Sequence, residues 1–145
     1  MIIRSSQFAV FQQQVDMLFV ERVVRELLET DADVVVQFPT YTTTVSKIPD
    51  ETLQFMVTSG IARARNYSMT WESALFSFVS LMFSVAPNFD QHPNIQQVLK
   101  DTTIVPDERI DQLWERISEE DWEAVEQNYN PHAWGIEPVK KIKIT

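Results

Sequence analysis

The chain of 145 residues contains no cysteine, only two glycines and only two histidines. Without cysteine it can form neither a disulfide nor a thiolate metal site, and it has no cysteine nucleophile. The two glycines, far apart at positions 60 and 135, cannot build a Walker loop, a dinucleotide-binding fingerprint or a Gly-x-Ser-x-Gly nucleophile elbow. Enzymes that depend on these motifs are therefore excluded, and the scarcity of glycine also argues against a turn-rich all-β fold.

Basic residues are also scarce. The chain has twelve Lys and Arg and 21 Asp and Glu, which gives a formal net charge of −9. It has no stripe of basic residues that could bind nucleic acid and release counterions from it. Acidic residues are concentrated between Asp107 and Glu126, a segment with nine carboxylates and only two basic residues, Arg109 and Arg116. The last residues, VKKIKIT, are basic instead. This polarity suits recognition of a basic protein surface, although a solvated helix face is the alternative interpretation. We expect a protein partner and no nucleic acid.

Long apolar runs are absent as well. The longest uncharged stretch, residues 73–89, has 17 residues and contains four serines, a proline and an asparagine. A membrane span needs about 20 predominantly apolar residues, so this stretch predicts a buried central helix and no membrane span. The N-terminal MIIRSSQFAVFQQQ has no continuous apolar segment and no small-residue cleavage pattern, which predicts no secretory signal and a cytoplasmic location.

What the sequence does contain is helical periodicity. A first helix is expected from about Gln7, with Ser5 or Ser6 as its N-cap and an end between Thr30 and Gln37. Its apolar positions recur at three- and four-residue steps: Phe8, Phe11, Val15, Leu18, Phe19, Val23 and Leu27. The following TYTTTVSKIP is β-branched, but it has no obvious partner strand and is predicted to be a loop.

Two further helices are expected before residue 86. The first has Pro49 in its first turn, Asn66 as a left-handed C-cap and Gly60 in its interior, where only a close helix crossing would explain a glycine. The next, WESALFSFVSLMFSV, has Thr70 as its N-cap. It is apolar around most of its circumference, so it belongs at the centre of the bundle.

The C-terminal part predicts two or three more helices. They are PNIQQVLKD, PDERIDQLWERI with Trp114 on its inward face, and SEEDWEAVEQNY with a near capping box at Ser118 and Asp121. The last two are either separate helices or one bent helix. The chain is thus predicted to be all-α: a single-domain bundle of about five to six helices over residues 1–130, and an extended tail over 131–145 packed on the domain or on a partner.

Partner-binding residues are expected in the acidic segment and in the tail. Trp134 has few apolar neighbours in sequence, which makes it a candidate partner contact or tail anchor. The tail ends in an alternating Ile-Lys pattern that could pair with a sheet edge. The predicted partner-binding residues are Glu119, Glu120, Glu123, Trp134, Ile142 and Ile144.

The stretch FSVAPNFDQHPN, residues 83–94, is the part of the sequence that most resembles a catalytic or metal site. Asp90 and His92 could provide half of a metal site, but a zinc site needs three or four ligands, and the other histidine, His132, has no supporting spacing. The structural alternative is that Pro87 ends the central helix and Asp90 caps the helix that begins near Pro93. We therefore assign no catalytic residue, metal or cofactor, and keep a small metal-dependent hydrolase centred on Asp90 and His92 as an alternative.

Four segments together resemble a known family: MIIRSSQFAVFQ, GIARARNY, ALFSFVSLMFSVAPNFDQHPNIQQVL and ERIDQL. They are similar to small, largely uncharacterised proteins of Gram-negative bacteria encoded near type VI secretion spike and effector genes, over residues 1–117. Ser68 and Ala86 stand where that family often has glycine. The resemblance implies a non-enzymatic accessory protein, either an adaptor or chaperone for a secreted effector or spike component, or an immunity protein that neutralises a toxin.

Overall fold

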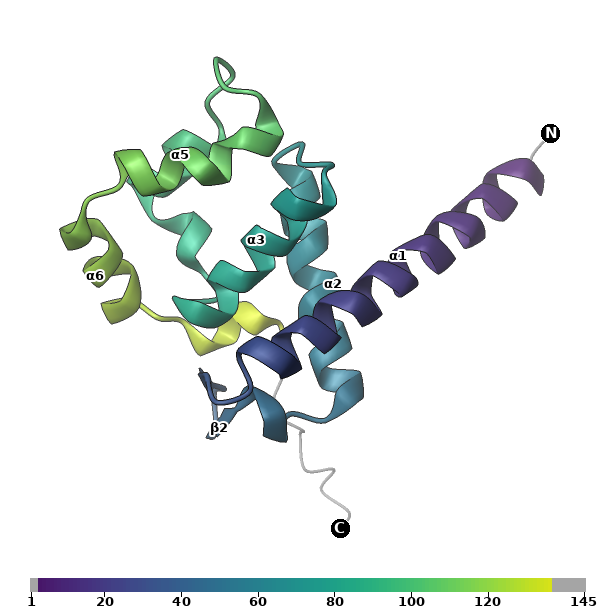
Figure 1. Ribbon diagram of the computed structural model, residues 1–145, viewed down its shortest axis with the longest axis horizontal. Helices are drawn as coiled ribbons and strands as arrows, with labels where there is room; N and C mark the ends of the chain where they lie inside the picture. Colours follow the sequence, from purple (N-terminus) through teal and green to yellow (C-terminus); the bar gives the residue numbers. More distant parts are fainter. Residues whose placement is uncertain (1–2, 137–145) are drawn as a thin grey trace, which may run out of the picture.

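The fold is a bundle of α-helices with one short β-hairpin (Figure 1). In the computed structural model the backbone is described for residues 3–136 and the side chains for residues 17–136. The elements in chain order are α1 (Ile3–Thr30), β1 (Val35–Gln37), β2 (Thr42–Thr44), the 3-10 helix η1 (Val45–Lys47), α2 (Asp50–Asn66), α3 (Glu72–Ser84), η2 (Phe89–Gln91), α4 (Pro93–Leu99), η3 (Pro106–Glu108), α5 (Arg109–Arg116), α6 (Glu119–Gln127) and η4 (Pro131–Trp134). The described part of the chain thus confirms the predicted all-α class with six α-helices.

Helix α1 is long, and Figure 1 shows its N-terminal half extending beyond the body of the molecule. Its C-terminal half is buried along one side, through Phe19, Val23 and Leu27 as predicted. The predicted N-cap at Ser5 or Ser6 is wrong, because the helix already begins at Ile3. Leu18 was also assigned to the buried face, but it is 65% exposed because no other element within residues 3–136 covers that side of the helix.

The loop prediction for TYTTTVSKIP is wrong in part. Residues 42–44 form β2, which pairs antiparallel with β1 in the register Val36↔Thr43. The partner strand is the run of valines after α1, whose β-branched side chains suit a strand better than a helix. Val36 of β1 and Val45, which follows β2 in η1, are fully buried, so this region contributes to the core.

Helices α2 and α3 cross closely at Gly60, as the mid-helix glycine predicted. A Cβ at residue 60 would lie 2.7 Å from Sδ of Met82 and 3.0 Å from Cγ2 of Val79. Glycine here therefore allows close helix packing, and a larger residue would force the Met82 and Val79 side chains or the helices to shift. Seven residues of α3 are buried, which confirms it as the central helix, and no helix in residues 3–136 is long and apolar enough to cross a membrane.

The turn between α2 and α3 differs from the prediction at both ends. The left-handed residue is Ser68, with φ of 69°, and not Asn66, which is still helical. A non-glycine residue in this conformation costs roughly 1 kcal/mol. The backbone at Ser68 thus has a conformation that glycine would favour.

The N-terminus of α3 is capped from outside its own segment. The predicted N-cap Thr70 precedes the cap residue, Trp71, whose side chain makes no capping hydrogen bond. Instead the carboxylate of Asp107, on η3, accepts from the backbone N–H of Thr70 at 2.6 Å and of Trp71 at 2.7 Å. Burial raises the pKa of Asp107, but these hydrogen bonds outweigh it and hold the pKa below its ordinary value.

Helices α5 and α6 are separate, because Ile117 between them is extended, with φ −95° and ψ 128°. The predicted capping box is confirmed on one side, since the Ser118 hydroxyl accepts from the backbone N–H of Asp121 at 3.1 Å. The inward assignment of Trp114 is wrong. Its side chain is 61% exposed, because Ile110, Leu113 and Ile117 already fill the buried face of α5.

The described part of the predicted tail, residues 131–136, packs on the domain. Trp134 is 1% exposed, its ring centroid lies 4.8 Å from that of Phe83 on α3, and its indole N–H donates to the hydroxyl of Tyr129 at 3.0 Å. Trp134 therefore anchors the segment after α6 in the core. The basic end, with Ile142 and Ile144, lies outside the described residues.

Candidate functional site

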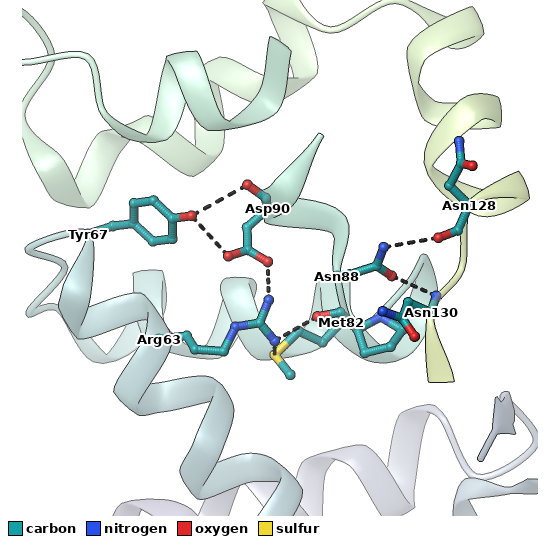
Figure 2. A network of polar contacts seen from close by, with 8 residues as sticks. Arg63, Tyr67, Met82, Asn88, Asp90, Asn128 and Asn130 are labelled. Carbon is teal, nitrogen blue, oxygen red and sulfur yellow. Dashed lines mark hydrogen bonds and ion pairs between the residues drawn. The ribbon is translucent and has the colours of Figure 1, made fainter. Parts of the chain in front are cut away.

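The loop between α3 and α4 joins several distant parts of the chain (Figure 2). The side-chain amide of Asn88 donates to the carbonyl of Asn128 at 3.0 Å, and its oxygen accepts from the backbone N–H of Asn130 at 3.0 Å. Two residues later, Asp90 turns the other way, towards α2. FSVAPNFDQHPN thus connects α2, through Asp90, with the segment after α6, through Asn88.

Asp90 is a buried carboxylate, 5% exposed, held by two side chains of α2 and its end. One oxygen forms an ion pair and hydrogen bond with Nη2 of Arg63, and the other accepts from the hydroxyl of Tyr67 at 2.9 Å (Figure 2). Arg63 also donates from Nη1 to the carbonyl of Pro87 at 2.6 Å. The prediction that Asp90 caps α4 is therefore wrong, since both of its oxygens are used by α2 and by the residue that follows it.

His92, two residues after Asp90, caps α4 instead. Nδ1 of His92 accepts from the backbone N–H of Asn94 at 3.2 Å, and Nε2 lies 3.7 Å from the carboxylate of Asp121 on α6. A hydrogen bond from the side chain of Asn94 is the main cause that lowers the pKa of Asp121. His92 therefore acts as an N-cap of α4 and as a contact to α6.

The structure separates the two halves of the supposed metal site. Asp90 is directed to Arg63 and Tyr67, whereas His92 is directed to Asn94 and Asp121. Within the residues that the structure describes, no group of three or more His, Asp or Glu side chains is placed to hold a metal ion. The third ligand that a metal-dependent hydrolase at Asp90 and His92 would require is therefore not found in that part of the chain.

Burial raises the pKa of Tyr67 to about 12, and the negative charge of Asp90 beside it adds to this effect. Because the folded-state pKa lies above the ordinary value of 10.0, the neutral phenol stabilises the fold. This contribution is fully present below pH 10, and it is lost as the pH rises through about 12.

We expect the free energy of unfolding to fall more steeply above pH 10 in the wild type than in Tyr67→Phe, which has no phenol to ionise at this position. Chemical denaturation at a series of pH values, with tyrosinate absorbance recorded in parallel, measures both quantities. Asp90→Asn should move the Tyr67 ionisation to lower pH, because it removes a negative charge beside the phenol. Equal pH slopes for the wild type and Tyr67→Phe would contradict the expectation.

Next to Asp90 the surface is hollowed into a cavity of about 460 Å³. Its lining includes Arg63, Lys100 and Arg109, with Asp90 as the one carboxylate among its lining residues. Arg109 is only 7% exposed and donates to three backbone carbonyls: Leu99 at 2.8 Å, Tyr67 at 3.1 Å and Ile104 at 3.2 Å. This cavity is locally cationic in an otherwise acidic chain.

A second candidate surface lies on α5 and α6. The exposed ring of Trp114 stacks on Trp122, with centroids 5.4 Å apart and planes at 25°. On α6, Glu119, Glu123 and Glu126 lie at helical spacing around Trp122, and all three are exposed. We call Trp114, Trp122 and these three glutamates the tryptophan face.

The predicted partner-binding residues are thus divided. Glu119, Glu120 and Glu123 are exposed on α6, and their assignment as partner contacts stays a prediction. Trp134 is in the core, so a partner cannot reach it in this fold. Ile142 and Ile144 lie outside the described residues, and their assignment stays a prediction.

Several residues of both sites were not predicted. The sequence patterns assigned no site role to Arg63, Tyr67 or Arg109. Asp90 lies 27 positions after Arg63, and no local pattern indicates a pair at that separation. The Trp114–Trp122 stack had one available signal, two tryptophans eight positions apart in an acidic segment.

Comparisons with models of protein families, with curated proteins and with solved structures found no match. The candidate sites are therefore interpreted from their own geometry.

Proposed function

We propose that this chain is an accessory protein that binds another protein through the tryptophan face. The observation that carries the proposal is the exposed Trp114, stacked on Trp122, with exposed glutamates near Trp122 on α6. Tryptophan is enriched among the residues that dominate binding energy at protein interfaces. The side chain of Trp114 is 61% exposed, so covering its aromatic surface with a partner would stabilise the complex.

The charge around the tryptophans indicates the chemistry of the partner. The two cations of this segment are engaged elsewhere, because Arg109 is buried and Arg116 donates to Asp101 at 3.2 Å. Among side chains of residues 17–136, none of the cations forms an ion pair with Glu119, Glu120 or Glu123. Such carboxylates attract a basic surface, and an arginine of that surface can stack on the face of Trp114.

The resemblance supplies the finer part of the proposal. It suggests that the partner is a type VI secretion effector or spike component, for which this chain is a cytoplasmic adaptor or chaperone. An immunity protein that neutralises a cognate toxin is the alternative within the same class. The two roles differ in outcome, because a chaperone leaves the bound toxin active after release, whereas an immunity protein inhibits it while bound.

The test is co-expression with the product of the neighbouring gene, followed by measurement of the dissociation constant of the complex. We expect Trp114→Ala to weaken binding by roughly 30-fold, as for an interface residue worth about 2 kcal/mol. Trp71→Ala is the matched control, since Trp71 is 53% exposed on a different part of the surface. Charge reversal at Glu119 and Glu123 should slow association, most strongly at low salt.

Two outcomes would contradict the proposal. If Trp114→Ala binds like the wild type while Trp71→Ala weakens binding, the interface lies elsewhere. If no complex forms with the products of genes beside it, the secretion-linked role is wrong. An assay of the partner's toxicity with and without this chain then separates the chaperone from the immunity protein.

A further inference from the structure

The cationic cavity beside Asp90 is independent of the tryptophan face and contains an unusual group, the buried guanidinium of Arg109. The three hydrogen bonds of this guanidinium all go to neutral backbone carbonyls. Leu99 and Tyr67 stand at the C-terminal ends of α4 and α2, so two helix dipoles direct partial negative charge at it. No carboxylate in the described part of the chain forms an ion pair with Arg109, so its full positive charge is only partly balanced.

One edge of this guanidinium is left for a ligand. Nε donates to Ile104 and Nη1 donates to Tyr67 and Leu99, whereas Nη2 makes no hydrogen bond. Every buried side-chain nitrogen or oxygen in residues 17–136 has a partner, so Nη2 must be accessible to solvent. Because Arg109 lines the cavity, Nη2 is the guanidinium donor that remains for a ligand there.

The rest of the lining favours an anion. Lys100 is exposed at the C-cap of α4, and Gln96 and Thr102 add uncharged hydrogen-bonding groups. Asp90 is the lining carboxylate, and its charge is compensated by Arg63. Arg63, Lys100 and Arg109 against Asp90 leave the lining with a charge of +2, in a chain whose formal net charge is −9.

We propose that this cavity binds a small organic anion through its phosphate or carboxylate group. The anionic group lies between Nη2 of Arg109 and the ammonium group of Lys100, and the remainder of the molecule contacts Gln96 and Thr102. Arginine presents a planar donor edge that fits both oxyanions, and lysine adds a point charge. The volume of about 460 Å³ lies within the range of small-molecule sites and exceeds what a lone inorganic ion fills.

The test is a titration of the full ¹⁵N-labelled chain with inorganic phosphate, glucose 6-phosphate and citrate, each against sodium chloride of equal ionic strength. We expect saturable shifts of the Arg109 side-chain Nε–H and of the backbone amides around Gln96 to Thr102, with one of the two organic anions binding more tightly than inorganic phosphate. Preference for glucose 6-phosphate assigns a phosphate ester, and preference for citrate assigns a carboxylate. The chloride control separates binding from general screening.

Lys100→Gln is the decisive variant, because Lys100 is exposed and its replacement should leave the fold intact. It should weaken anion binding by about tenfold or more, through loss of a charge-assisted hydrogen bond. Lys47→Gln removes the same charge from an exposed position on η1 and should bind as the wild type does. The proposal is overturned if no organic anion gives saturable shifts beyond those of chloride, or if Lys100→Gln and Lys47→Gln bind equally well.

Discussion

Replacement of Arg109 by methionine is expected to lower the free energy of unfolding by about 4 kcal/mol. Methionine keeps the aliphatic part of the side chain but has no donor, so the carbonyls of Tyr67, Leu99 and Ile104 lose their shared partner. Each unsatisfied buried carbonyl costs about 1 to 3 kcal/mol, and solvent entering the cavity recovers part of that cost. These carbonyls lie at the end of α2, at the end of α4 and in the turn before α5, so one side chain holds three segments together.

Chemical denaturation of the wild type and the variant measures this difference. Arg25→Met is the matched control, since Arg25 is exposed on α1, and it should change stability by no more than about 0.5 kcal/mol. Arg109→Lys should recover only part of the loss, because an ammonium group cannot reproduce the planar arrangement of the guanidinium donors. A loss below about 1 kcal/mol for Arg109→Met would show that water replaces the guanidinium without strain.

Asp90→Asn is expected to cost about 3 kcal/mol, the next largest effect. Removing one partner of a buried ion pair typically costs about 3 to 5 kcal/mol, because the other charge is left without compensation. Here the side chain of Arg63 is 24% exposed, and partial hydration places the cost at the lower end of that range. Asparagine keeps the size of the side chain but carries no charge, so the loss reports on the ion pair and not on packing.

Two comparisons make this prediction specific. Asp33→Asn removes a carboxylate from an exposed position and should be nearly neutral. His92→Ala removes the N-cap of α4 and should cost only about 1 kcal/mol. If His92→Ala proves as costly as Asp90→Asn, the loop is held mainly by its capping bond and the Arg63–Asp90–Tyr67 cluster is secondary.

A double-mutant cycle with Tyr67→Phe would separate the two contacts of Asp90. Tyr67 and Arg63 bind different oxygens of the same carboxylate, so their contributions should not add. We expect a coupling of about 1 kcal/mol between Asp90→Asn and Tyr67→Phe, within the range for residues that share a hydrogen-bonded network. Strict additivity would indicate that the phenol gains little from the carboxylate.

Trp114 and Trp134 show what sequence patterns leave undecided. Trp114 was assigned to the inward face of its helix and is exposed, whereas Trp134 was assigned to a partner or to an anchoring role and is buried. Helical periodicity indicates which residues share a face, but a face is buried only if another element covers it. The segment after α6 folds back over Phe83 and buries Trp134, and nothing in residues 17–136 covers Trp114 to the same degree.

The corrections at helix ends have a related cause. Ser118 was predicted as an N-cap, and the structure confirms it. Its hydroxyl accepts from the backbone N–H of Asp121, only three residues away. The cap of α3 comes instead from Asp107, 36 and 37 positions after the N–H groups that it accepts from. Sequence patterns find capping groups within one helical turn and miss those that arrive from another element.

By itself, the sequence determined the all-α class, the central position of the helix around Phe78, the close crossing at Gly60 and the acidic character of the segment from Asp107 to Glu126. These properties follow from composition and from contacts within a few residues, which the chain carries wherever it folds. Tertiary structure alone decided that Asp90 pairs with Arg63 and that Arg109 lines a cavity. Such pairings depend on which distant segments the packing of the core brings together, and no local pattern encodes that outcome.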